Sequence, residues 1–252
     1  MLNNEDLLRV LNEVKSLLDK EKIPFWLEAG TLLGAIRDKK IIPWDTDIDL
    51  AAFKTDFPDS RKRKLAQYLE KKGFIVHFFP NKIDIAAKSS HLTVHLIYGP
   101  KGGYFVWKRL GGNDKLGLFL LKICKLANVS YYGKFRFSFS GDYLFNLKTD
   151  LFKLITLIPK SVKNKFSEFA LARLSNSDIS GVYCLKIPTS YISKFKKIDF
   201  YGSSFNAPIS HDKYLEEEYG NWRSPPKDPK KWFWYKNGNW KKIKSNNLER
   251  ID

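Results

Sequence analysis

Residues 42–49 read IPWDTDID, and they follow residues 26–37, which read WLEAGTLLGAIR. From Ile41 the pattern has a period of two, which predicts a strand with Asp45, Asp47, Asp49 and Ala51 on one side. Aspartates two apart on a strand lie about 6 to 7 Å apart at their backbones. Three such carboxylates repel each other unless a cation, basic groups or water compensates, and the pattern therefore predicts a site for Mg²⁺.

Two other interpretations of the aspartates stay open. An acidic strand edge exposed to solvent would give the same pattern, and Asp-x-Asp also marks glycosyltransferases that use sugar nucleotides. The preceding residues add specificity, because Gly30 and Thr31 are expected between a strand and a short helix. Backbone amides at a helix N-terminus can hold a phosphate, so this turn and the strand after it form a composite signal, although an ordinary tight turn would look similar when taken alone.

The hydrophobic pattern predicts an α+β fold. Helices are expected over residues 7–18, 32–37 and 61–72, and strands over 24–29, 41–52, 74–79, 82–88 and 92–98. This order predicts a small mixed sheet with helical cover. In the last strand, Leu92, Val94 and Leu96 would form the apolar face, which leaves His91 and His95 on the other.

The chain is expected to divide near residue 110, into a catalytic core (1–110) and a mainly helical, aromatic subdomain (111–252) that completes the pocket. Helices are expected over 151–158, 160–174 and 211–219, with an amphipathic helix over 116–129. Asn237-Gly238 between aromatic runs indicates a hairpin.

The charge of the chain suggests polyanionic partners. There are 44 Lys plus Arg against 27 Asp plus Glu, a formal charge of +17, which suits phosphate-bearing substrates, anionic lipid or nucleic acid; a merely solvated basic surface is the alternative. Two lone cysteines, Cys124 and Cys184, exclude a zinc site built on Cys-x-x-Cys and a disulfide framework. With no apolar run long enough to span a bilayer, we expect a cytoplasmic protein, with peripheral binding to the inner face of a membrane as an alternative.

The two quoted runs closely resemble the signature of the LicD and fukutin-related family. A second resemblance lies downstream, in Phe200-Tyr201-Gly202, Pro208, Tyr214-Leu215, Tyr219-Gly220-Asn221-Trp222 and Pro225-Pro226. Together the two segments span residues 26 to 226, which is almost the whole chain.

The resemblance implies a nucleotidyltransferase-like fold and transfer of a phosphorylated alcohol from a CDP-alcohol to the hydroxyl of a glycan or lipid-linked glycan, with release of CMP. The alcohol phosphate would be phosphocholine, ribitol phosphate or glycerol phosphate, and the metal Mg²⁺ or Mn²⁺. By position, Asp47 and Asp49 resemble the metal-binding pair, which Asp45 supports.

The resemblance also assigns Gly30 and Thr31 to the phosphate-holding turn. Arg37 is predicted to bind the diphosphate, although an ion pair on its own short helix is an alternative.

The chain departs from the family at a later strand. Relatives commonly carry an aspartate there, whereas this chain reads Val94-His95-Leu96-Ile97. His95 could bind metal or act as a general base, or it could merely face solvent. Asp84 on the preceding strand is the rival for the missing carboxylate. His91 and His95 are not expected to chelate one metal, because their backbones would lie about 13 Å apart.

Two other functions stay open. One is transfer of a nucleoside monophosphate, as other enzymes of this fold perform. The other is a non-catalytic module that binds nucleic acid or a membrane, with nucleic acid the less favoured partner.

Overall fold

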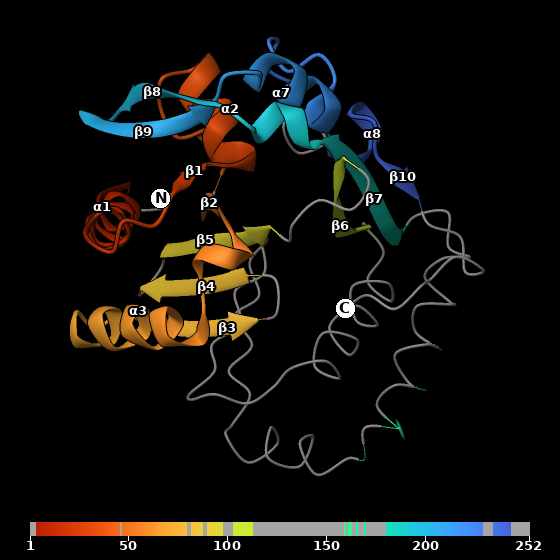
Figure 1. The fold of residues 1–252 in the computed structure, drawn as a ribbon. Coiled ribbons are helices and arrows are strands. Elements are labelled where there is room, and N and C mark those ends of the chain that lie inside the picture. Colours follow the sequence, from red (N-terminus) through yellow and green to blue (C-terminus); the bar gives the residue numbers. More distant parts are fainter. Residues whose placement is uncertain are drawn as a thin grey trace.

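The computed structural model describes residues 4–45, 47–79, 82–87, 90–97, 103–112, 180–228 and 234–242, with a few positions between 159 and 169. The helices expected over 116–129 and 151–158, and nearly all of the helix expected over 160–174, lie outside these residues. Figure 1 shows the described elements in the order of the chain.

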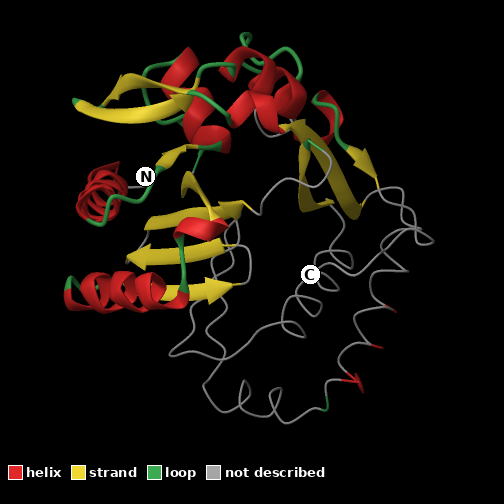
Figure 2. Ribbon diagram, viewed as in Figure 1, coloured by secondary structure: helices red, strands yellow, loops and turns green. Residues whose placement is uncertain are grey.

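The N-terminal elements agree in type with the prediction. They are α1 (Asn4–Lys20), β1 (Phe25–Leu27), α2 (Ala29–Arg37), β2 (Asp47–Phe53), the 3₁₀ turn η1 (Lys54–Asp56), α3 (Asp59–Lys71), β3 (Ile75–Phe79), β4 (Lys82–Ala87) and β5 (Ser90–Ile97). The five strands form one sheet in the order β1-β2-β5-β4-β3. The β2–β5 pair is parallel and the others are antiparallel, so the sheet is mixed, as predicted (Figure 2).

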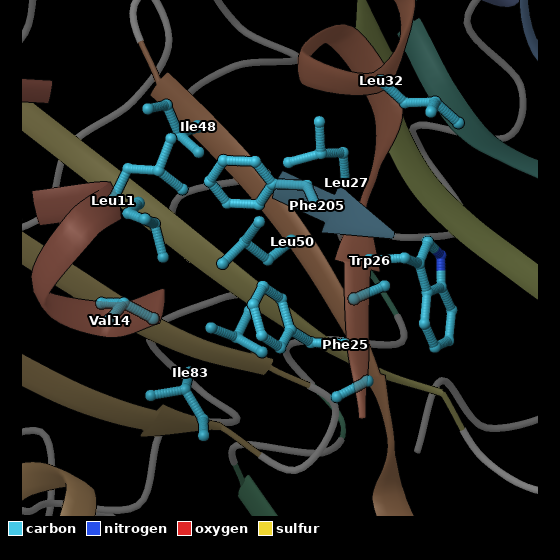
Figure 3. Packing of buried hydrophobic residues seen from close by; sticks show 14 of the residues in the cluster. Leu11, Val14, Phe25, Trp26, Leu27, Leu32, Ile48, Leu50, Ile83 and Phe205 are labelled. Atoms are coloured by element: carbon cyan, nitrogen blue, oxygen red, sulfur yellow. The ribbon is translucent and has the colours of Figure 1, made fainter. Parts of the chain in front are cut away.

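One face of this sheet forms the core. Ile48, Leu50, Leu92 and Val94 are fully buried on it, and α1 and α3 pack against the sheet. Figure 3 shows side chains of α1 beside those of β2 and β4 in the same cluster. Because side chains alternate along a strand, the residues between these apolar positions project from the opposite face, where the aspartates lie.

The C-terminal elements add a second sheet and a hairpin. They are β6 (Tyr104–Gly112), β7 (Ser180–Pro188), η2 (Thr189–Ile192), β8 (Phe195–Phe200), β9 (Ser203–Pro208), α7 (His211–Tyr219), α8 (Trp234–Asn237) and β10 (Lys241–Lys242). Strands β10, β7 and β6 form a three-stranded sheet, and β8 pairs with β9. Helix α7 matches its predicted range. The described part of this subdomain therefore holds several strands besides its helices, and the boundary predicted near residue 110 falls within β6; the division itself stays a prediction.

The C-terminal elements pack directly on the first sheet. The Phe205 ring of β9 lies 6.4 Å from the Phe25 ring of β1, and Asn206 Nδ2 donates to the Phe25 carbonyl at 2.7 Å. Figure 3 shows Phe205 among side chains of α1, β1 and β2. The hairpin β8–β9 thus belongs to the same hydrophobic core as the strands that carry the aspartates.

The predicted hairpin at Asn237-Gly238 is wrong. Residues 234–237 are helical, and Gly238 lies so close to the carbonyls of Glu217 and Glu218 that a Cβ would overlap them. The next amide, of Asn239, donates to the Glu217 carbonyl at 2.7 Å. Gly238 is therefore required for close packing against the end of α7 rather than for a two-residue turn. Among the described residues, no helix combines the length and the apolar character needed to cross a bilayer.

Gly34 allows the loop after α2 to fold back over the helix. A Cβ at this position would lie 2.5 Å from the Lys40 carbonyl oxygen and 3.2 Å from Ile42 Cγ1. We expect Gly34→Ala to lower the free energy of unfolding by about 1–3 kcal/mol through overpacking, although alanine is the better helix former. Urea unfolding measures this change. An unchanged or raised free energy would mean that the loop can move away from the helix at no cost.

Candidate active site

The polar face of the first sheet brings together several of the predicted site residues from neighbouring strands. In the register of β2 and β5, Asp47 pairs with His91 and Asp49 with Thr93. Next along the sheet, Asp84 of β4 pairs with Thr93. Since residues paired in register lie on the same face, this face carries three carboxylates and the two histidines of β5.

Asp49 and His95 are in direct contact. His95 Nε2 lies 3.0 Å from Asp49 Oδ1, and both side chains are largely buried. His91, by contrast, faces Asp84, with its Nε2 3.9 Å from Asp84 Oδ2. The two imidazoles therefore have different carboxylate neighbours.

The surroundings of Asp47 disfavour its negative charge. Burial raises the pKa of this carboxyl above its ordinary value, and the charge of Asp49 raises it further. A side-chain hydrogen bond with Asp45 and the nearby imidazoles of His91 and His95 act in the opposite direction without cancelling the rise. A cation placed beside Asp47 and Asp49 would relieve this repulsion.

Asp45 is not on the strand with the other two aspartates. Strand β2 begins at Asp47, and the Asp45 amide donates to the Ile42 carbonyl at 2.9 Å in the turn before it. A Cβ on Gly30 would overlap Asp45 Oδ2, so the carboxylate rests against the first turn of α2. An anion is favourable at that end of a helix. Gly30 is thus needed for this close approach.

Thr31 is buried, and it holds the backbone of Asp49. Helix α2 begins at Ala29, so Gly30 and Thr31 lie within its first turn. The sequence had predicted them before the helix. The Asp49 amide donates to Thr31 Oγ1 at 2.9 Å, and the Glu28 amide donates to the Asp49 carbonyl at 3.0 Å. The role of Gly30 and Thr31 in phosphate binding stays a prediction beside these structural contacts.

Arg37 forms the ion pair that was the alternative to diphosphate binding. Its Nε and Nη2 donate to the two carboxylate oxygens of Asp38 at 2.9 and 2.7 Å. Its Nη1 donates to the Trp222 carbonyl at 3.2 Å. The guanidinium therefore links α2 to the segment after α7, and contact with a donor diphosphate stays a prediction.

Asp84 has partners of its own, two strands away from β2. Its Oδ2 accepts from Lys82 Nζ at 2.6 Å, and its Oδ1 accepts from Thr93 Oγ1 at 3.2 Å. Burial alone would raise the pKa of Asp84, but the ammonium charge and hydrogen bond of Lys82, with His91 and His95 nearby, outweigh it and leave the pKa below its ordinary value. Asp84 is thus a compensated carboxylate, unlike Asp47.

Sequence reasoning missed Glu28 as a residue of this region. Its side chain is completely buried; Oε2 accepts from Trp26 Nε1 at 2.8 Å, and Oε1 accepts from the Tyr214 hydroxyl of α7. A glutamate at the end of an apolar run, two residues before the Gly30-Thr31 pair, is the signal that could have identified it.

The downstream segment with the second resemblance lies against the first one. Besides the Tyr214 contact, Tyr201 accepts a hydrogen bond from the Ile41 amide at 3.1 Å through its hydroxyl. The Trp222 carbonyl accepts from Arg37. Figure 1 shows α7 and the β8–β9 hairpin next to α2, at the same end of the molecule. The two segments are therefore parts of one structural unit.

The donor set fits a hard cation that also binds substrate. Asp47 and Asp49 offer carboxylate oxygens on one strand face, with an excess of negative charge. In the part of the chain that the structure describes, no three side chains of Asp, Glu, His or Cys converge closely enough to hold a metal ion by themselves. Mg²⁺ usually binds through one or two carboxylates and completes its shell with water and substrate phosphates, which suits this arrangement.

In a comparison with known proteins, residues 22–157 match one domain family, the LicD/FKTN/FKRP nucleotidyltransferase domain. The lipopolysaccharide cholinephosphotransferase LicD of Haemophilus influenzae is 22% identical, over 89% of this chain and 91% of that protein. The human ribitol 5-phosphate transferase FKRP is 36% identical over 75 residues, which is 27% of this chain and 15% of FKRP.

A third relative, the protein RP689 of Rickettsia prowazekii, is 27% identical over 50% of this chain and 49% of its own length. The chain therefore spans about half the length of this relative. Among solved structures, the lincosamide antibiotic adenylyltransferase LnuA overlaps with a TM-score of 0.37 at 13% identity, over 85% of both chains.

Asp47→Asn and Asp84→Asn make the same chemical change on the same sheet face, and we expect opposite results at neutral pH without divalent cations. The raised pKa of Asp47 means that stability is lost as pH rises through that pKa, so Asp47→Asn should raise the melting temperature. The lowered pKa of Asp84 means that ionised Asp84 stabilises the fold, and this contribution is lost only as pH falls through that pKa. Asp84→Asn should therefore lower the melting temperature.

Thermal unfolding followed across the acidic and neutral range measures both changes. Destabilisation by Asp47→Asn comparable to that by Asp84→Asn would show that Asp47 is compensated already without a cation.

Proposed function

Because the chain belongs to the LicD/FKTN/FKRP nucleotidyltransferase-domain family, we propose that it transfers a phosphorylated alcohol from a CDP-alcohol to a hydroxyl of a cell-surface glycan and releases CMP. The alcohol phosphate would be phosphocholine, ribitol phosphate or glycerol phosphate. The observation that carries the proposal is the position of Asp47 and Asp49 on the same face of β2. His95 and the Asp45 carboxylate at the start of α2 lie beside them.

We assign the binding of Mg²⁺ or Mn²⁺ to Asp47 and Asp49. When bound, the ion supplies positive charge against the donor diphosphate. Asp45 supports this pair from the turn before β2, where its carboxylate rests against the first turn of α2. Gly30 permits the position of Asp45, and Thr31 fixes the strand that carries Asp49.

In the proposed reaction, the acceptor oxygen forms a bond to the phosphorus that carries the alcohol. The bond from this phosphorus to the oxygen of CMP breaks, and CMP leaves with the electron pair. We assign uptake of the hydroxyl proton to His95, since it adjoins Asp49 while Asp84 is two strands from β2 and is engaged with Lys82. Positioning of the two substrates and neutralisation of charge would supply most of the rate.

The net charge of +17 supports an anionic donor and an anionic, lipid-linked acceptor. Association with the inner face of an anionic membrane is part of this proposal, and it would be weakened by salt.

Loss of either metal-binding carboxylate tests the assignment of the site. Purified protein with Mg²⁺, a glycan acceptor and CDP-choline, CDP-ribitol or CDP-glycerol should release CMP, and Asp47→Ala or Asp49→Ala should reduce the rate by at least about 10²-fold. Chromatography of the nucleotide products measures the release. Glu13→Ala, an acidic residue of α1 paired with Lys72, is the control that should keep the rate. CMP release that both aspartate variants retain would refute the assignment, and pyrophosphate from a nucleoside triphosphate would indicate nucleotidyl transfer instead.

The role of His95 is tested by a pair of variants. Glutamine can donate a hydrogen bond to Asp49 but cannot take up a proton at neutral pH, so His95→Gln should keep the affinity for Mn²⁺ and lose about 10²- to 10⁴-fold in turnover. His95→Ala should lose turnover to the same extent and also weaken Mn²⁺ binding. Rapid-quench turnover and calorimetric titration measure the two quantities. If His95→Gln turns over at nearly the normal rate, His95 only orients Asp49.

A further inference from the structure

Asp49 is held at its backbone by the segment 28–31, which runs from the end of β1 into the first turn of α2. Its amide donates to Thr31 Oγ1 at 2.9 Å, and its carbonyl accepts from the Glu28 amide at 3.0 Å. Two residues only three apart in the chain therefore bind both backbone polar groups of one residue, the N–H and the C=O on either side of the Asp49 Cα. Any shift of this segment displaces Asp49 with it.

The segment itself has a backbone that needs support. Ala29 has a φ of 48°, in the left-handed region that costs a residue with a Cβ about 1–2 kcal/mol. Such a conformation persists only where its surroundings hold it. Ala29 lies between Glu28 and Gly30, so the conformation depends on what fixes the chain on each side.

On one side the fixing group is the Glu28 carboxylate. It is inaccessible to solvent, and each of its oxygens accepts a hydrogen bond: Oε2 from Trp26 of β1 and Oε1 from the Tyr214 hydroxyl of α7. Tyr214 is also fully buried. A buried acceptor that loses its donor costs about 1–3 kcal/mol or more, so this pair holds α7 and the β1–α2 segment together strongly.

We propose that Glu28 is a positioning residue that couples α7 to the metal-binding carboxylate Asp49, through Tyr214 on one side and the Asp49 backbone on the other. The proposal rests on the proposed function in one respect, the assignment of Asp49 to the metal. Glu28 contacts neither substrate nor metal; it sets the orientation from which Asp49 presents its oxygens. The C-terminal subdomain thereby controls the affinity of the N-terminal carboxylates for their cation.

If Glu28 only stabilised the fold, its loss would lower the melting temperature and leave the affinity of the folded protein for metal unchanged. Loss of positioning also weakens metal binding in the folded protein, and a higher metal concentration restores the turnover.

Tyr214→Phe removes the donor to Glu28 and leaves the ring in place. The chain offers a matched control, because Tyr68 of α3 donates to Glu13 of α1 at 2.9 Å, on helices that pack against the apolar face of the sheet. Tyr68→Phe removes a tyrosine–glutamate hydrogen bond away from the aspartates. Glu28→Gln is the second variant, since its amide cannot accept at both ends.

Full-length protein is titrated with Mn²⁺ in the presence of CDP by calorimetry, and the Mn²⁺ concentration for half-maximal CMP release is measured in parallel. We expect Tyr214→Phe and Glu28→Gln to weaken Mn²⁺ binding by about 10-fold, as loss of an outer partner of a metal ligand typically does. The half-maximal Mn²⁺ concentration should rise equally, and turnover should recover at high Mn²⁺. Tyr68→Phe should leave both values unchanged, and the double variant should be no worse than Glu28→Gln alone.

Normal Mn²⁺ affinity in folded Tyr214→Phe and Glu28→Gln would overturn the proposal. If the unsubstituted chain binds no Mn²⁺ and releases no CMP, the proposed function fails, and the coupling is then judged by amide hydrogen exchange of residues 47–53. Faster exchange there in Tyr214→Phe than in Tyr68→Phe supports the link from α7 to Asp49, and equal exchange refutes it. Should Tyr214→Phe not fold, Glu28→Gln decides by the same measurements.

Discussion

The hydrogen bonds on either side of Asp49 are the constraint on which the arrangement of the site depends. The Glu28 amide continues the ladder between β1 and β2 by one residue, and the Thr31 hydroxyl then holds the same strand from within the first turn of α2. This contact forces the chain from strand to helix within a few residues, which explains the left-handed backbone of Ala29. Because the turn is so tight, the start of α2 lies against the carboxylate of Asp45.

The polar face of the sheet shows how partners decide the state of similar carboxylates. Asp84 and Asp47 both lose water on burial, which disfavours their charge. Asp84 has the ammonium of Lys82 at 2.6 Å, and its pKa falls. Asp47 has Asp49 as a neighbour, and its pKa rises. The same face therefore holds one compensated carboxylate, suited to structure, and one uncompensated carboxylate, suited to a ligand of positive charge.

Much of the fold was predictable because it depends on local pattern. The helical spacing of α1 and the alternation of β2 and β5 each reflect burial of one face, and the family resemblance is confirmed by the matched domain. Contacts between distant segments were not predictable. The Glu28 carboxylate accepts a hydrogen bond from Tyr214, which is 186 residues away in the chain. Asp45 lies outside the strand because its amide bonds to the Ile42 carbonyl in a turn, and Gly238 packs on α7 instead of forming a hairpin. The periodicity of the sequence predicts neither contact.

The excess of basic residues and the acidic face of β2 act over different distances. A net charge of +17 attracts an anionic donor from solution, but such attraction between exposed charges is screened beyond about 10 Å in ordinary salt. Near the sheet, a diphosphate meets Asp47 and Asp49, which repel it. On the proposed function, a divalent cation reverses the sign of this last step, so that the general field brings the donor to the protein and only the metal-loaded face accepts it. Binding of the donor and binding of the metal are then coupled, because each compensates the charge that would exclude the other.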